Sequence, residues 1–442
     1  MKGILLKNHR IIFYGFWFLL ALMQASATEL ITDEDYYWVF SKYLDWGYLD
    51  HPPMVALLVK WGYAIIHNEL GVRLLFVLLN TLTIGLIEKL TDYKQPFLFY
   101  SIVISIGILQ LGGYLAVPDF PLLFFTALFF YCYKKFLEKS SLSNALLLGL
   151  TISLLMYSKY HGVLVIFFVL ISNLKILSRW QTWIAGIFAL LLFMPHIYWQ
   201  WEHDWISFRF HLVEKRVTHY SILSVLEYIM GQVLLAGPLI GFILLPSAVR
   251  YKSKSDAERS MKFTLLGIYI FFLILSVREK MEANWTISVL VPLIVLSHQY
   301  LLDKVNLMKA VRIIAMISFM LIVAGRIYLI VDIGPYNGVK RKFFYNREWV
   351  LDVHKKFGDT PVIFYDSYQQ ASQYWFYTGI PSYSIKTEGE RRSNYEMWPV
   401  YDSLVGKKVI IWGPKKRKDL TDSIMTARGW FRYKTVESLP PR

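Results

Sequence analysis

Long apolar segments separated by short polar loops make up the first three quarters of the chain. A hydrocarbon core about 30 Å thick is crossed by about 20 apolar helical residues, and somewhat fewer suffice where neighbouring helices bury the ends. The pattern predicts eleven transmembrane helices. They lie at about 11–28, 71–88, 96–115, 120–133, 143–157, 161–177, 181–198, 229–249, 261–277, 286–301 and 311–330.

From about Ile333 the pattern changes to short alternating polar and apolar runs, which are typical of a water-exposed domain. Segments 361–367, 407–413 and 430–438 read as strands, and segments 349–357 and 419–429 read as helices. We therefore expect a transmembrane domain over residues 1–332 and a small soluble α/β domain over residues 333–442.

Composition agrees with a membrane protein. Hydrophobic residues make up 55% of the 442 positions and charged residues only 18%, against roughly 25% charged residues in soluble domains. The net charge of +15 does not indicate a nucleic-acid partner, because the basic residues form short clusters between apolar runs. The single cysteine, Cys132, excludes internal disulfides and CxxC motifs.

The basic clusters indicate the topology, because Lys and Arg in short loops stay on the cytoplasmic side. Alternate loops are basic and the intervening loops are acidic, which predicts a cytoplasmic N-terminus and an extracytoplasmic C-terminal domain. The first apolar run also resembles a cleavable signal peptide, since it ends in Ala25-Ser26-Ala27. We favour retention as a helix, because an anchor would hold the acidic residues that follow.

The first outer loop, residues 29–70, contains the densest polar chemistry. Thr32 is a plausible N-cap for an aromatic, amphipathic helix that begins with Asp33, Glu34 and Asp35 and is suited to the membrane interface. Simple capping would explain these acids. However, Asp50-His51-Pro52-Pro53 stiffens the end of the segment, and carboxylates at the bilayer surface are costly unless they bind something.

Further polar residues are predicted on the same outer face. Asp119 lies between two prolines, where helix capping is the alternative role, and Lys159 is suited to a phosphate, where snorkelling is the alternative. The loop 195–216 includes His211 and Arg216, and its histidines could supply a divalent-metal site or a phosphate clamp. Together these loops offer acids and aromatic rings for a sugar, and cations for a lipid phosphate.

Two segments of the first outer loop resemble the opening signature of the PMT-like glycosyltransferases. They are Thr32-Asp33-Glu34-Asp35-Tyr36-Tyr37-Trp38 and Gly47-Tyr48-Leu49-Asp50-His51-Pro52-Pro53. This PMT-like or RgtA-B-C-D-like family of GT-C membrane enzymes includes dolichyl-phosphate-mannose protein mannosyltransferases and bacterial lipid A aminoarabinose transferases. Later pieces fall in the family's order, namely Val117-Pro118-Asp119, Ser158-Lys159-Tyr160, the loop from Trp199 to Arg216, and Asn284-Trp285.

The resemblance implies an inverting transferase that moves a hexosyl or pentosyl group from a polyprenyl-phosphate donor to an acceptor hydroxyl on the outer face. It implies that Asp33 is the general base, that Glu34 positions it, and that Asp119 is a second catalytic acid. His51, Lys159 and Arg216 are the implied donor-phosphate contacts. Where aminoarabinose transferases have Glu-Lys, this chain has Asp50-His51, and neutral imidazole is a weaker phosphate partner.

The resemblance also implies a divalent metal ion, with Asp50 and His211 as its ligands. The implied location is the bacterial inner membrane, and the implied acceptor is a protein, a lipid or a glycan. A transporter or flippase of lipid-linked glycans is the main alternative. Transport sites lie near the bilayer midplane, whereas here the predicted spans carry few charges and the polar residues gather at one surface.

Overall fold

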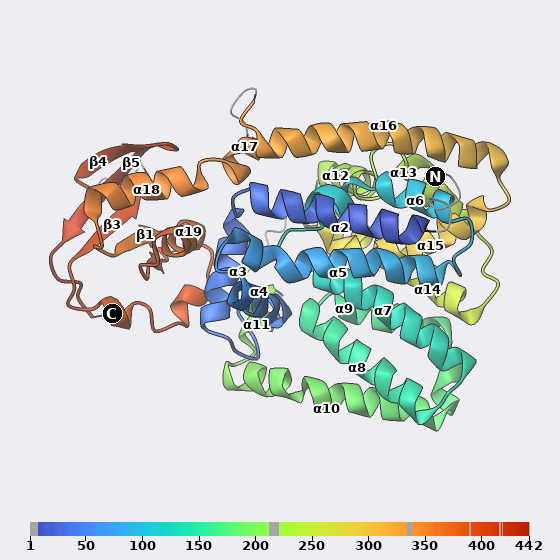
Figure 1. Cartoon of the computed structure of the whole chain (residues 1–442). Coiled ribbons are helices and arrows are strands. Elements are labelled where there is room, and N and C mark those ends of the chain that lie inside the picture. The colour runs from blue at the N-terminus through green and yellow to red at the C-terminus, as the bar shows by residue number, and fades with distance from the viewer. Residues whose placement is uncertain are drawn as a thin grey trace.

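The computed structural model describes residues 8–211, 221–333, 338–388, 390–414, 417 and 419–441. Its helices form an elongated bundle, and a smaller domain containing a β-sheet is attached at one end of that bundle (Figure 1). This is the predicted fold class of a polytopic helical protein with a small C-terminal α/β domain.

Six helices are long and apolar enough to cross a membrane within the described ranges. They are α2 (His9–Ala27), α5 (Glu69–Leu90), α7 (Asp119–Glu138), α10 (Trp180–Glu202), α14 (Asp256–Ser276) and α16 (Val305–Ile330). Shorter helices fill the rest of the bundle. They are α4 (Met54–Ile65), α6 (Pro96–Ile104), α8 (Leu142–Ser158), α9 (Gly162–Ser172), α11 (Ile206–Arg209), α12 (Ile222–Leu235), α13 (Gly241–Arg250) and α15 (Leu290–Leu301).

Three of the predicted spans are interrupted. The span expected at 161–177 is divided at Asn173 into α9 and a 3-10 helical turn, η2 (Leu174–Ser178). The span expected at 229–249 is divided into α12 and α13 by Gly237 and the proline that follows it. Gly237 has a φ of +108°, which residues with a side chain rarely adopt. The span expected at 96–115 ends as α6 at Ile104 and continues as a π-helical turn, η1 (Ile108–Gly112). Arg326 of α16 donates to the Gln110 carbonyl in that turn at 2.6 Å, which supports the irregular backbone.

The first outer loop forms helix α3 (Thr32–Lys42), and here the expected N-cap is wrong. Thr32 is the first helical residue and Ile31 is the N-cap, and the Glu34 carboxylate accepts the Ile31 N–H at 3.0 Å. Helix α3 lies between the bundle and the C-terminal domain (Figure 1) and packs against α19 (Tyr368–Thr378). Every residue from Glu34 to Ser41 is consequently buried.

The C-terminal domain contains a five-stranded sheet in the order β2-β1-β3-β5-β4. The strands are β1 (Val362–Tyr365), β2 (Tyr383–Ile385), β3 (Val409–Gly413), β4 (Asp422–Thr426) and β5 (Gly429–Val436). Strand β1 is parallel to β2 and β3, and β5 is antiparallel to β3 and β4. The helices are α17 (Gly338–Phe343), α18 (Asn346–Phe357) and α19.

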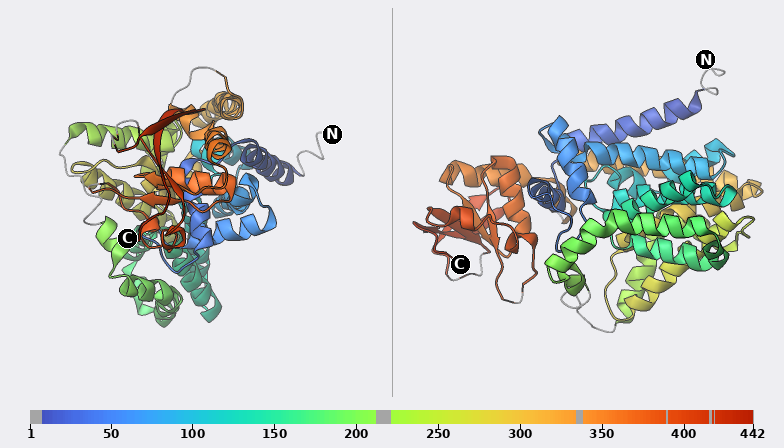
Figure 2. Two further views of the ribbon diagram at one scale, coloured as in Figure 1. Left: turned by 90° about the vertical axis from the view of Figure 1, so that its left-hand side faces the viewer. Right: turned by 90° about the horizontal axis from the view of Figure 1, so that it is seen from below.

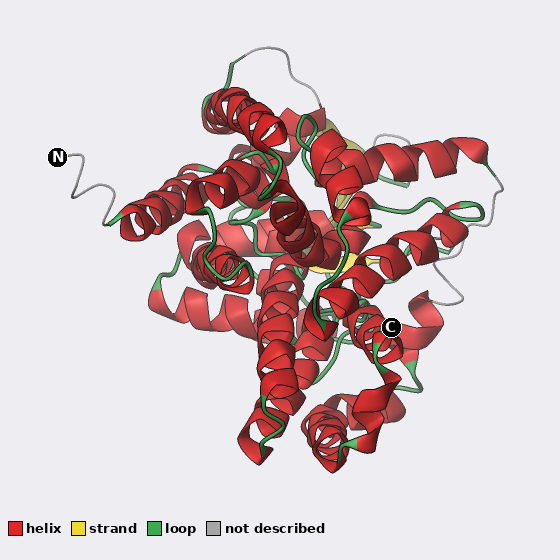
Figure 3. Ribbon diagram, turned by 90° about the vertical axis from the view of Figure 1, so that its right-hand side faces the viewer, coloured by secondary structure: helices red, strands yellow, loops and turns green. Residues whose placement is uncertain are grey.

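The helix expected at 419–429 is wrong, because residues 422–426 form strand β4. Ile424 and Thr426 are buried while their neighbours are exposed, which is the two-residue period of a strand. A turn at Gly429, with φ of +104°, joins β4 to β5 as a hairpin. The domain covers one end of the bundle (Figure 2), and the view from the opposite end shows helices with the strands behind them (Figure 3).

Candidate active site

Glu34 is held on all sides by the protein. Its side chain is fully buried and pairs with the equally buried Arg73 of α5, at 2.8 Å to Oε1 and 2.5 Å to Oε2. The N–H groups of Ala116 and Ile31 donate to the same two oxygens. Both carboxylate oxygens are therefore occupied, and Glu34 fixes the start of α3 to two other segments.

Arg73 extends this connection toward the end of α2. Its guanidinium also donates to the carbonyls of Ala25, Thr28 and Glu29 at 2.7–3.1 Å. A buried pair of this kind is costly to desolvate unless additional hydrogen bonds satisfy its remaining groups. Here the additional bonds are present, so the pair is a rigid support behind the acidic cluster.

Asp35 is a different kind of buried acid. It has no exposed surface, and neither carboxyl oxygen has a hydrogen-bond partner among the described residues. Burial raises the pKa of this carboxyl well above its usual value, and the negative charge of Glu34 raises it further. Asp35 is thereby favoured in its neutral form and cannot serve as a ready proton acceptor.

Asp33 is the acid of this cluster that is open to a substrate. It is only partly buried, and within the described ranges one side chain binds it, since Gln369 Nε2 of α19 donates to Oδ1 at 3.3 Å. Oδ2 accepts no hydrogen bond from those residues. Asp33, the predicted base, is thus oriented by Gln369 through Oδ1, while Oδ2 is available to a substrate.

Asp119, Lys159 and Asn284 come together from three separate predicted segments. Lys159 Nζ lies 2.9 Å from Asp119 Oδ1, and Asn284 Nδ2 donates to the same oxygen at 3.1 Å. Asp119 and Lys159 are only 6% and 5% exposed. The sequence suggested a cap or a snorkelling lysine as alternatives, but these side chains instead form a buried ion pair at the start of α7.

Asp50 is clamped by the C-terminal domain. Arg391 Nη2 lies 3.1 Å from Asp50 Oδ2, and Asn394 Nδ2 lies 3.4 Å from Oδ1. His211 Nε2 lies 3.0 Å from the backbone carbonyl of Asp50, while the ring of His51 packs against Tyr37. Asp50, predicted as a metal ligand, is therefore paired with a cation that the sequence did not single out.

Tyr37 shows that these acids share one site. Burial raises the pKa of its phenol well above the usual value, and the negative charges of Asp33, Asp50 and Asp119 raise it further, in that order. All three carboxylates therefore act on one phenol. Asp33 and Asp119, the first and last of these acids, are 86 residues apart in the sequence.

Two histidines at the C-terminal end of α10, His196 within the helix and His203 at its C-cap, hold backbone carbonyl groups. His196 Nδ1 lies 2.7 Å from the Trp46 carbonyl, and His203 Nδ1 lies 2.8 Å from the Trp199 carbonyl. Arg216, predicted as a phosphate contact, lies outside the described residues. The histidines described here thus anchor the first outer loop and the turn after α10.

The predicted metal site is not tested by these contacts. The Asp50 carboxylate faces hydrogen-bond donors, and in the part of the chain that the structure describes no three His, Cys, Asp or Glu side chains are grouped so that they could hold a metal ion. A divalent ion at Asp50 and His211 remains a prediction, and no step proposed below depends on it.

Several site residues were missed at the level of sequence. Arg73 lies within an apolar run, where a lone buried charge is itself a signal of a partner. By contrast, Gln369, Arg391 and Asn394 lie in a polar tail in which nothing marks them out. They reach the site because the C-terminal domain covers α3.

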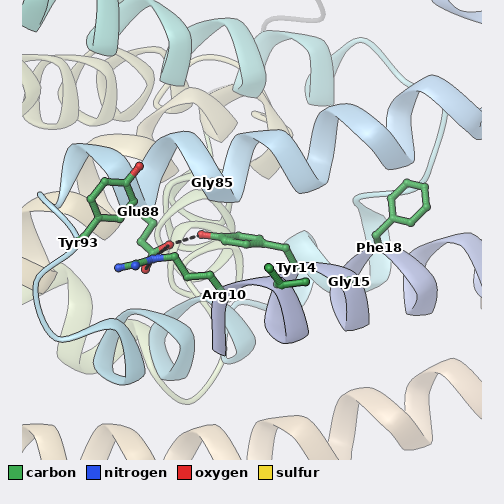
Figure 4. Close-up of a pocket in the computed structure, with 8 residues that line it drawn as sticks. Arg10, Tyr14, Gly15, Phe18, Gly85, Glu88 and Tyr93 are labelled. Atoms are coloured by element: carbon green, nitrogen blue, oxygen red, sulfur yellow. Dashed lines mark hydrogen bonds and ion pairs between the residues drawn. The ribbon is translucent and has the colours of Figure 1, made fainter. Parts of the chain in front are cut away.

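A separate crevice of about 570 Å³ lies at the other end of α2 and α5 (Figure 4). There Glu88 bonds Arg10 at 3.2 Å and Tyr14 at 2.5 Å. Glu88 is 15 residues from Arg73 on α5, which is about 22 Å at the helical rise of 1.5 Å per residue. The crevice is therefore distinct from the acidic site.

Comparison with solved structures identifies the architecture. The crystal structure of apo ArnT from Cupriavidus metallidurans superposes with a TM-score of 0.72 at 12% identity, covering 99% of each chain. The structure of the same protein bound to undecaprenyl phosphate superposes with a TM-score of 0.71 at 13% identity, covering 98% of this chain and 99% of that one. The chain has a GT-C fold.

Sequence comparisons agree with this GT-C assignment. Residues 50–199 match the family described as dolichyl-phosphate-mannose-protein mannosyltransferase. The chain is 25% identical over 285 residues to lipid A galacturonosyltransferase RgtD of Rhizobium johnstonii, an alignment that spans 60% of this chain and 59% of that protein. The resemblance to PMT-like membrane glycosyltransferases is therefore confirmed, and the GT-C chain is an integral membrane protein.

Proposed function

We propose that this GT-C protein is an inverting glycosyltransferase that moves a sugar from a polyprenyl-phosphate donor to an acceptor hydroxyl on the extracytoplasmic face. One observation carries the proposal. Three carboxylates, the partly open Asp33 together with Asp50 and Asp119, act on the phenol of Tyr37 at one end of the helical bundle, and the last two pair with the cations Arg391 and Lys159.

The chemistry requires three things of these residues. The acceptor oxygen attacks the anomeric carbon while the bond from that carbon to the phosphate oxygen breaks, so polyprenyl phosphate leaves with the bonding electrons. Asp33 Oδ2 takes the acceptor proton as the new bond forms, and Gln369 holds the other oxygen. A fixed carboxylate contributes through orientation as well as basicity.

The surrounding groups support this step without exchanging protons. The Glu34–Arg73 pair fixes the helix that carries Asp33, and the Asp119–Lys159 pair places charge beside the reacting centre. The cations stabilise the charge of the departing phosphate in a partly water-excluded site, where such interactions are strong. The Tyr37 side chain of α3 lies where the charges of Asp33, Asp50 and Asp119 act on it.

The relatives support the donor and the location. ArnT has been crystallised with undecaprenyl phosphate, and RgtD is named for sugar transfer to lipid A. We propose the same class of donor here. We also propose that the site lies on the extracytoplasmic side of the bacterial inner membrane and the N-terminus in the cytoplasm. The gathering of charges at the end of the bundle favours transfer over the alternative of transport, which uses ionisable residues near the midplane.

Lipid and glycan profiling of a deletion strain tests the proposal. We expect one undecaprenyl-phosphate monosaccharide to accumulate and the same sugar to disappear from one envelope glycoconjugate, with lipid A, glycans and glycoproteins each examined by mass spectrometry. Restoring the gene should reverse both changes. An unchanged profile would overturn the transferase, whereas accumulation of an undecaprenyl-linked oligosaccharide confined to the cytoplasmic leaflet would indicate a flippase.

A further inference from the structure

The C-terminal domain contributes a short segment, residues 390–394, to the wall of the site. Asn394 is 1% exposed and is fixed there by the first outer loop. Its Oδ1 accepts the Leu49 N–H at 2.9 Å, and its own N–H and Nδ2 donate to the Tyr36 hydroxyl at 2.8 and 3.0 Å. The segment therefore has a defined position relative to α3 and Asp50.

Arg391 is held in this segment but is not enclosed. Its guanidinium lies 5.3 Å from the centre of the Tyr368 ring and 5.6 Å from that of Phe210, and Asp50 accepts one of its N–H groups. The Arg391 side chain nevertheless remains 49% exposed, whereas that of Asp50 is 7% exposed. Because a guanidinium has five N–H donors, this contact leaves donor capacity on the accessible part of the side chain.

The cation lies next to the proposed base. Consecutive residues of α19 contact the two groups, since Tyr368 stacks with Arg391 and Gln369 donates to Asp33. The negative charges of Asp33 and Asp50 also both act on the Tyr368 phenol, raising its pKa after the larger effect of burial. A group that reaches from Asp33 to Asp50 would therefore contact Arg391.

Among the described residues, a donor phosphate has few other cationic partners at this site. His51 is a weak anion partner when neutral, and Lys159 is already paired with Asp119 inside the protein. We infer that Arg391 binds the phosphate of the polyprenyl-phosphate donor, so that the soluble domain completes the donor site. This inference rests on the proposed function, and it assigns Arg391 a role beyond an ion pair that joins two domains.

Binding of undecaprenyl phosphate to the full-length protein in nanodiscs tests this inference without requiring transfer. We would measure its affinity in the presence of EDTA for the wild type, Arg391→Ala, Arg391→Lys, Asp50→Asn and the matched control Arg392→Ala. Arg392 is adjacent in the chain but pairs with Glu396. Thermal unfolding of each protein would accompany the titration, and inorganic phosphate would serve as a second ligand.

We expect Arg391→Ala to weaken the binding of undecaprenyl phosphate at least ~10-fold. Arg391→Lys should weaken binding less, because lysine keeps the positive charge but lacks the planar guanidinium group. Arg392→Ala should stay within about 2-fold. Asp50→Asn should bind as tightly as the wild type or more tightly, because it removes a competing carboxylate from Arg391. Inorganic phosphate should bind weakly, and Arg391→Ala should not reduce its affinity as much as it reduces that of undecaprenyl phosphate.

Other outcomes would overturn the inference. If Arg391→Ala and Asp50→Asn reduced the affinity for undecaprenyl phosphate equally, and the double variant reduced it no further, the pair would only join the domains. Equal loss for inorganic phosphate would show a general anion site rather than a lipid-phosphate site. If Arg391→Ala unfolds, unchanged binding by a folded Arg391→Lys would reject the bidentate contact. Failure of the wild type itself to bind would contradict the proposed function as well.

Discussion

Two sides of helix α3 use acidic residues for opposite purposes. On the closed side, Glu34 is saturated by Arg73 and two backbone N–H groups, and Asp35 is buried without a hydrogen-bond partner among the described residues. On the open side, Asp33 keeps one carboxylate oxygen accessible. Adjacent acids can therefore be a structural lock, a neutral buried group and a reactive base, and their surroundings rather than their residue type decide which.

The closed side is most sensitive at the Glu34–Arg73 pair. Glu34→Gln should destabilise the protein by about 3–5 kcal/mol, because it leaves a fully buried guanidinium without its counter-ion. Thermal and denaturant unfolding in detergent measure this loss. A double variant, Glu34→Gln with Arg73→Met, should recover part of it. A single variant as stable as the wild type would contradict the closed-side assignment.

The second buried pair borders the open side, so its loss should affect transfer. Lys159→Met should reduce kcat by about 10- to 100-fold, because it removes one of the cations proposed to stabilise the departing phosphate. Adding Asp119→Asn should restore stability but not the rate. If the double variant transferred sugar at the wild-type rate, the pair would have no role in the reaction.

The stability of the protein should depend on pH through Glu29, whose carbonyl binds Arg73 on the closed side. Burial raises its pKa to about 7 from 4.5, and the neighbouring Glu348 adds to the shift. Between pH 4.5 and 7 the folded state therefore binds more protons than the unfolded state, so stability falls as pH rises. Relative to Glu29→Gln, the wild type should lose about 2–3 kcal/mol over this range. A difference that stays constant with pH would refute the shift.

Asp35→Asn should have the smallest effect. An amide resembles the neutral acid in size, and we expect a change below about 1 kcal/mol in stability and below about 3-fold in transfer. Parallel unfolding and transfer measurements on the same preparation test both values. A large loss of transfer with normal stability would place Asp35, instead of Asp33, in the reaction.

The membrane part of this picture was readable from the sequence. Apolar runs are a direct consequence of bilayer thickness, and the fold class they predicted is confirmed, although Gly237 and the π-helical turn after α6 divide two spans. The acidic motif and the prediction that its loops meet also followed from the residues. The assignment of roles within the site remains a prediction.

The division of labour on α3 could not be predicted in the same way. Nothing in Asp33-Glu34-Asp35 says which acid meets Arg73, because that depends on how α3 and α5 are placed on either side of α4. Likewise Gln369 and Arg391 reach the site through the docking of a domain whose sequence resembles any small α/β unit. Strand β4 was mistaken for a helix for a related reason, since its pattern is short and its partner β5 decides its conformation.

If Asp33 is the base and its acidic neighbours are not, Asp33→Asn and Asp35→Asn should differ sharply. Both variants would be compared in purified, folded protein, with undecaprenyl-phosphate monosaccharides as donors and the acceptor identified by profiling. We expect Asp33→Asn to lose at least ~1,000-fold in single-turnover transfer, to bind undecaprenyl phosphate and to unfold at the wild-type temperature, while Asp35→Asn remains active. Transfer by Asp33→Asn within 10-fold of the wild type would contradict this assignment of the base.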